Sequence, residues 1–131
     1  MSLVTKELFK RCVIAQQSAY TELLSLCSPV FEDDGFITTA FMSAYSGKVE
    51  LRCGPAEYHL ELFVHDDTGE NRRTLSELIA LPNVREWMKA NRADLEGKQR
   101  IEAEVAYAFR LLNEAISRVP EMNWLRRKSK P

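Results

Sequence analysis

Two histidines and a glutamate lie near one another in the sequence and have the residue types of a metal site. His59, Glu61 and His65 fall on one side of a segment in which apolar and polar residues alternate, and two histidines with one carboxylate can bind a transition metal. The alternation predicts a strand, along which His59 and His65 are about 20 Å apart at about 3.3 Å per residue. One metal ion cannot bridge that distance, and a site would need ligands from elsewhere in the chain. We therefore predict no metal site.

Three cysteines are the other candidates for redox or metal chemistry. Cys12 and Cys27 lie on one predicted helix, about 22 Å apart at a rise of about 1.5 Å per residue, which is too far for a disulfide bond. None of the three, Cys53 included, belongs to a C-x-x-C pair, and the odd count argues against a disulfide framework. We interpret all three as small buried apolar residues.

Other catalytic patterns are absent from the sequence. There is no G-x-S-x-G motif, and the five glycines are scattered singly instead of forming a phosphate-binding loop. The acidic segment Val30–Gly35 lacks the alternating oxygen ligands and the terminal glutamate of a calcium loop, so we interpret it as a solvated turn. The sequence therefore predicts a protein that is not an enzyme and has no cofactor. An enzyme with an unrecognised motif is the alternative.

Composition narrows the class of protein further. The chain has 131 residues, of which 45% are hydrophobic and 28% charged, and we expect one globular domain over residues 1–125 with a basic tail over 126–131. A net charge of −1 gives no electrostatic reason to expect a nucleic-acid or anionic-membrane partner. No long apolar run and no secretory signal are visible, so we expect a cytoplasmic protein. The oligomeric state is left open.

The segment that would position His59 and Glu61 is a predicted β-hairpin over Lys48–His65. Apolar and polar residues alternate on both sides of Gly54-Pro55, which is typical of two strands joined by a tight turn. A two-residue loop pairs Arg52 with Glu57, Glu50 with His59 and Lys48 with Glu61. We prefer it to a four-residue loop, which would place Glu50 opposite Glu61 and oppose like charges.

The elements around the hairpin complete an α+β domain. Spacing of apolar residues and capping patterns predict helices over Ser2–Leu26, Thr74–Leu81, from Asn83 onward, and over Lys98–Val119, with a further strand over Phe36–Tyr45 that pairs Tyr45 with Lys48. We therefore expect a long N-terminal helix, a three-stranded antiparallel meander, two short helices, and a long C-terminal helix packed on one sheet face. The predicted core contains Leu51, Leu60, Leu62, Phe109 and Leu112.

The second face of the predicted sheet mixes aromatic and charged residues, a composition common at protein-binding surfaces. We predict that it binds a partner through Phe41, Tyr45, Glu50, His59, Glu61 and Phe63, together with the carboxylates Asp66, Asp67 and Glu70 along the same edge. Such carboxylates would steer the protein towards a basic cleft. The alternative is that a helix covers part of this face.

Two segments, Thr74–Met88 and Ile101–Leu112, resemble the C-terminal half of small immunity proteins of bacterial polymorphic and contact-dependent toxin systems. The resemblance covers roughly residues 57–125. It implies a protein that binds a cognate toxin domain and blocks its active site or its access to substrate, although no contact residue of that family can be assigned to a position here. The alternatives are a small adaptor or secretion chaperone that binds a segment of a partner protein, and a small-ligand-binding domain, for which the sequence gives no pocket signal.

Overall fold

A computed structural model of the chain describes residues 2–44, 47–55, 59–65, 72–75, 78–91 and 94–125. Its elements are α1 (Leu3–Ala19), β1 (Val30–Asp33), β2 (Thr38–Ser43), β3 (Lys48–Cys53), β4 (Glu61–His65), β5 (Arg72–Thr74), α2 (Val84–Asn91), α3 (Gly97–Arg118) and the 3-10 helix η2 (Pro120–Leu125). The strands form one antiparallel sheet in the order β1-β2-β3-β4-β5. The α+β class is confirmed, whereas the predicted three-stranded meander is only the centre of a five-stranded sheet.

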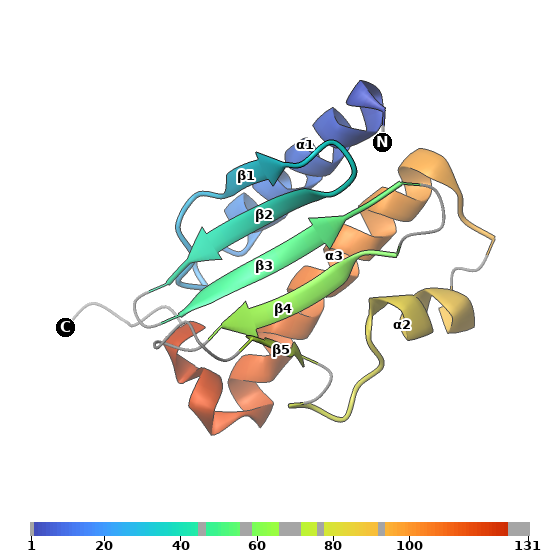
Figure 1. The fold of residues 1–131 in the computed structure, drawn as a ribbon. Helices are drawn as coiled ribbons and strands as arrows, with labels where there is room; N and C mark the ends of the chain where they lie inside the picture. The colour runs from blue at the N-terminus through green and yellow to red at the C-terminus, as the bar shows by residue number, and fades with distance from the viewer. Residues whose placement is uncertain are drawn as a thin grey trace.

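Helices α1 and α3 pack together against one face of the sheet, which we call the inner face (Figure 1). Side chains alternate along a strand, and the inner-face residues of the central strands are apolar and buried: Ala40, Met42, Val49, Leu51, Cys53, Leu62 and Val64. They share one hydrophobic cluster with Leu60, Phe109 and Leu112, so the predicted core is confirmed. No helix of the described residues covers the opposite, outer face (Figure 1).

Helix α1 ends well before the end of the predicted helix, Ser2–Leu26. Its start is as expected, since the Ser2 hydroxyl accepts a hydrogen bond from a backbone amide of the first turn at 3.2 Å. The chain after the helix is held by other elements, because the Ser25 N–H donates to the Leu125 carbonyl of η2 at 2.6 Å. The apolar spacing continued into this segment because Leu24 and Leu26 are buried in the core without being helical.

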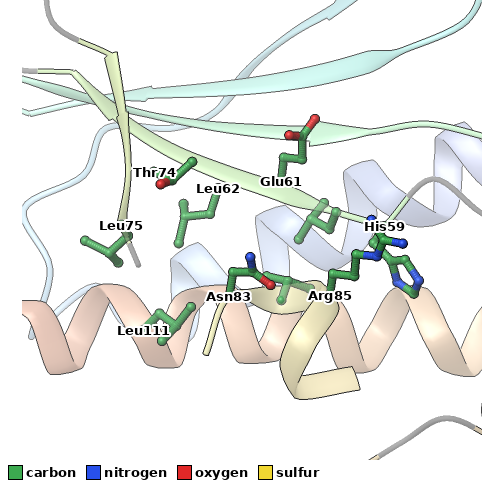
Figure 2. A pocket seen from close by; sticks show the side chains of 10 residues that line it. His59, Glu61, Leu62, Thr74, Leu75, Asn83, Arg85 and Leu111 are labelled. Atoms are coloured by element: carbon green, nitrogen blue, oxygen red, sulfur yellow. The ribbon is translucent and has the colours of Figure 1, made fainter. Parts of the chain in front are cut away.

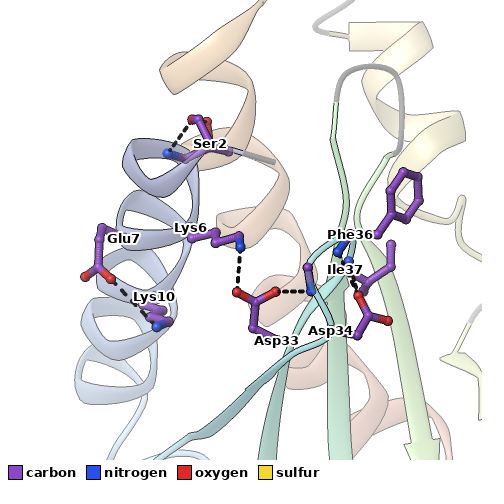
Figure 3. Close-up of polar contacts among 10 residues, drawn as sticks. Ser2, Lys6, Glu7, Lys10, Asp33, Asp34, Phe36 and Ile37 are labelled. Atoms are coloured by element: carbon purple, nitrogen blue, oxygen red, sulfur yellow. Dashed lines mark hydrogen bonds and ion pairs between the residues drawn. The ribbon is translucent and has the colours of Figure 1, made fainter.

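The acidic segment predicted as a turn is largely a strand, β1, and the turn follows it. Asp33 Oδ2 lies 2.6 Å from Lys6 Nζ of α1, and its Oδ1 accepts from the Gly35 N–H at 2.9 Å (Figure 3). Asp34 Oδ1 accepts from the Phe36 N–H at 2.8 Å and from the Ile37 N–H at 2.6 Å. Gly35 adopts a φ of 93°, which favours glycine. The two carboxylates therefore hold the turn through its backbone amides and connect it to α1 through Lys6.

Both central hairpins have a different register from the prediction. Strand β3 pairs with β4 as Lys48↔His65, Glu50↔Phe63 and Arg52↔Glu61, and β2 pairs with β3 through Ser43↔Lys48. The predicted pairs of Lys48 with Glu61 and with Tyr45 are therefore wrong. The observed register opposes Arg52 and Glu61, which have opposite charges. Each displacement is an even number of residues, so the side chains keep the faces that the alternation predicted.

The helix predicted over Thr74–Leu81 is wrong at both ends. Thr74 is the last residue of β5 and pairs with Phe63, and Leu78–Leu81 form turns and bends. Leu75 has a 3-10 conformation, and Ser76 and Glu77 lie outside the described residues. The cap at Asn83 is confirmed, because Asn83 Oδ1 accepts from the Glu86 N–H at 2.9 Å and α2 begins directly after it.

The C-terminal part follows the prediction closely. Helix α3 buries Ile101, Val105, Phe109 and Leu112 among other residues, and η2 returns Met122 and Leu125 to the core. Helix α2 is held against α3 by a stack of the Trp87 and Tyr107 rings, whose centroids are 4.3 Å apart at 8°. The Tyr107 hydroxyl donates to the Pro82 carbonyl at 2.7 Å. The predicted tail, 126–131, lies outside the described residues.

Candidate functional site

The outer face of the sheet contains most of the described residues that we predicted to bind a partner. One row of paired residues crosses all five strands: Val30, Phe41, Glu50, Phe63 and Thr74. Two further rows flank it, one of Ser43, Lys48, His65 and Arg72, the other of Glu32, Thr39, Arg52 and Glu61. Phe41, Glu50, Glu61 and Phe63 therefore share one surface, as the alternation predicted.

Each phenylalanine of this face has a cation against its ring. The Lys48 Nζ lies 5.0 Å from the centre of the Phe41 ring, and the Arg72 guanidinium lies 3.6 Å from the centre of the Phe63 ring. Both distances are within the range of cation–π attraction. Phe41 is half-buried, whereas Phe63 is only 8% exposed. Phe41 is thus partly accessible to a partner, and Phe63 is covered.

Glu50 is also covered, and it forms a buried pair with His65. Its Oε1 lies 2.9 Å from His65 Nε2, and its Oε2 lies 3.8 Å from Arg52 Nε. The two paired residues are 6% and 8% exposed. The pair satisfies two polar groups that would be costly to bury alone, so Glu50 has a structural role within the outer face. His65 was not among the predicted partner-binding residues.

His59 lies apart from the outer-face residues, next to Glu104 of α3. Glu104 Oε2 accepts from the Leu60 N–H at 2.5 Å, while its Oε1 lies 3.0 Å from Arg100 Nε and 3.4 Å from His59 Nδ1. Neither of these two contacts of Oε1 has the geometry of a hydrogen bond. Opposite charges four residues apart, as in Arg100 and Glu104, are typical of the solvated side of a helix, but Glu104 is 3% exposed. Glu104 lies between Ile101 and Val105, which are both buried. This position in the sequence was the sign that Glu104 could be buried as well.

The other predicted residues divide into one that the structure places and four that it does not. Glu61 is half-buried on the outer face, with Arg52 as its cross-strand neighbour. Tyr45, Asp66, Asp67 and Glu70 lie outside the described residues.

A pocket of ≈ 430 Å³ opens between the β4 edge, α2 and α3 (Figure 2). Strand β5 pairs only with Phe63–His65 of β4, and the pocket borders the part of β4 before this pairing. Its lining combines the aliphatic residues Leu60, Leu62, Leu75, Val84 and Leu111 with the polar residues His59, Glu61, Thr74, Asn83 and Arg85. This pocket was not apparent from the sequence, because its residues come from four separate segments.

The cysteines differ more in exposure than predicted. Cys53 is buried on the inner face and Cys12 is half-buried, but Cys27 is exposed, so the prediction is wrong for Cys27. Burial raises the pKa of the Cys53 thiol to about 12, and the Glu104 carboxylate adds to this effect. Among the described residues no group of three or more histidines, cysteines or carboxylates is arranged to hold a metal ion.

In the part of the chain that the structure describes, the helices are too short or too polar to cross a bilayer. Comparisons with protein-family models, with curated proteins and with solved structures found no match to this chain.

Proposed function

We propose that this protein is a cytoplasmic binding protein that neutralises a cognate bacterial toxin domain by blocking its active site or its access to substrate. The outer face of the sheet is the contact surface in this proposal. The supporting observation is that no helix of the described residues covers this face, on which the partly exposed Phe41 lies among cations and carboxylates. The resemblance to small immunity proteins supplies the class of partner.

The centre of the proposed interface is the pair Val30 and Phe41. Val30 is 64% exposed, and Phe41 beside it is half-buried under Lys48. A long lysine side chain is flexible, so a partner is able to displace it and bury both apolar residues. Rigid rings contribute a large contact area with few rotamers to order, which is why they dominate interface energies.

Charges of both signs surround that centre. Glu32 and Glu61 lie on the same face as Lys48, Arg52 and Arg72. Opposite charges that are matched across an interface accelerate association and exclude wrong partners. The proposed steering towards a basic cleft depends on Asp66, Asp67 and Glu70 and stays a prediction.

The test uses the protein domain encoded by the gene that neighbours the gene for this protein. Expression of that domain in a bacterial host should stop growth, and co-expression of the protein should restore it. Phe41→Ala should weaken binding of the purified domain by about 1–2 kcal/mol with little change in thermal stability. Phe36→Ala is the matched control, because Phe36 is 59% exposed but lies in the turn between β1 and β2.

Two results would contradict the proposal. Equal affinity of the Phe41→Ala and wild-type proteins would exclude the outer face as the contact surface. A partner domain that binds tightly but is neither toxic nor inhibited would favour the adaptor or secretion chaperone instead.

A further inference from the structure

The pocket beside β4 has the features of a small-molecule site and borders the surface proposed for the toxin domain, with which it shares Glu61 and Thr74. Its volume of ≈ 430 Å³ falls in the range of ligand pockets, which are mostly apolar with a few polar groups that orient the ligand. The apolar part is formed by aliphatic side chains from three directions, namely Leu62 of β4, Leu75 after β5 and Leu111 of α3.

The basic side chains Arg85 and His59 lie at one end of this pocket, whereas Thr74 lies beside Leu62 and Leu75. In Figure 2, Arg85 and His59 occupy the end opposite Leu75 and Leu111. Arg85 is exposed and, among the described residues, takes part in no ion pair. His59 has its Nδ1 turned to Glu104 at 3.4 Å. A guanidinium that no described carboxylate neutralises makes this end of the pocket suited to an anion.

Each of the three glutamates near the pocket has a neighbour other than Arg85. Glu61 points away from the apolar side chains in Figure 2 and has Arg52 as its cross-strand neighbour. Glu86 on the first turn of α2 accepts from the Asn83 N–H at 3.4 Å. Glu104 is buried behind His59 and pairs with Arg100. The backbone amides at the start of α2 add a further positive potential to the same end.

We propose that the pocket binds a small aliphatic carboxylate. The hydrocarbon chain lies against Leu62, Leu75 and Leu111, where it is removed from water. The carboxylate lies at Arg85, whose planar guanidinium matches two carboxylate oxygens. This assignment uses both halves of the pocket, the aliphatic wall for the chain and Arg85 for the carboxylate. It does not depend on the proposed toxin partner.

The test is a titration of the full chain with sodium octanoate below its micelle concentration, followed by the methyl NMR signals of Leu62, Leu75 and Leu111. We expect saturable shifts at these methyls. Acetate, which has the same head without the chain, and octylammonium, which has the same chain with the opposite charge, should each bind at least about tenfold more weakly.

The matched variants are Arg85→Gln and Arg11→Gln, both at exposed arginines. Arg85→Gln should weaken octanoate binding about tenfold, and Arg11→Gln on α1 should leave it unchanged. Absence of saturable binding overturns the proposal. So does binding that leaves the three leucine signals unmoved, that octylammonium reproduces, or that Arg85→Gln does not weaken.

Discussion

Some residues of the outer face of the sheet are buried as deeply as those of the inner face, but by different means. On the inner face Leu62 is 6% exposed and belongs to the hydrophobic cluster of the core. On the outer face Glu50 and Phe63 are 6% and 8% exposed, yet neither belongs to that cluster. Glu50 is paired with His65, and Phe63 lies under Arg72. Residues with the same exposed fraction therefore have different environments on the two faces. Packed helices cover the inner face, whereas charged side chains that a partner is able to move cover part of the outer face.

The rate of thiol alkylation should differ more than any other property between an inner-face residue and a surface residue. The pKa of Cys53 is about 12 instead of 9.0, so near pH 8 its thiolate is about a thousandfold rarer than that of an unperturbed thiol. Cys27 is exposed and should be alkylated by iodoacetamide within minutes, whereas Cys53 should react only after unfolding in urea. Peptide mass spectrometry reports both. Native labelling of Cys53 as fast as Cys27 would mean that the inner face is open.

Truncation of an inner-face leucine should be the next largest effect. Leu51 is 0% exposed on β3, and Leu51→Ala should lower the free energy of unfolding by about 2–5 kcal/mol because it leaves a cavity that the helices cannot fill. Leu23→Ala is the control, since Leu23 is 52% exposed and its loss should change stability by less than about 0.5 kcal/mol. Urea unfolding measures both, and equal midpoints would place Leu51 outside the core.

The buried pair of the outer face should contribute less than a core leucine. Glu50→Ala leaves His65 Nε2 without the partner that it has at 2.9 Å, which should cost about 1–3 kcal/mol of stability. Glu32→Ala on the same face removes an exposed carboxylate and serves as the control. If both variants unfold at the same urea concentration, Glu50 is not held in a buried pair.

The smallest effect should occur where α1 meets the edge strand. The Lys6 hydrogen bond, with help from the Gly35 amide, lowers the pKa of Asp33 below 3.8. A lowered pKa in the folded state stabilises the protein above pH 3.8 and loses this contribution as the pH falls through the lowered value. Lys6→Gln should therefore raise the pKa of Asp33 towards 3.8 in an NMR titration of the carboxyl carbon.

Asp34 is the internal control for that titration. Its pKa is lowered by the backbone amides of Ile37 and Phe36, and these contacts do not involve Lys6. A shift of both carboxyls in Lys6→Gln would indicate that the whole turn had changed.

Elements with a strong local pattern were predictable from the sequence. Strand β3 has the predicted bounds, Lys48–Cys53, and α3 agrees with the prediction within one residue at each end. Strands β1 and β5 were missed because both are short and polar, β1 containing Asp33 and β5 two arginines. Such segments become strands mainly because they pair with β2 and β4. Local propensity does not encode those contacts.

The candidate surface was predictable in its orientation but not in its exposure. Alternation places Phe41, Glu50, Glu61 and Phe63 on the same face under any even displacement of register. Whether a residue there is accessible depends on which long side chain lies over it, and the sequence did not predict that Arg72 covers Phe63. The pocket was beyond prediction because it forms only when β4, β5, α2 and α3 are assembled.

The hydrogen bond from the Leu60 N–H to Glu104 has a consequence for the order of folding. Turn rules alone favour the tight Gly54-Pro55 hairpin, whereas in the native register the Leu60 N–H donates to a carboxylate 44 residues later in the chain. We expect the β3–β4 hairpin to sample the shorter loop early in refolding and to reach its native register only after α3 docks. Contacts of large sequence separation form late because closing a long loop costs entropy. Misregistered hairpins thus become a kinetic trap during refolding, and Glu104→Ala should slow the final refolding phase.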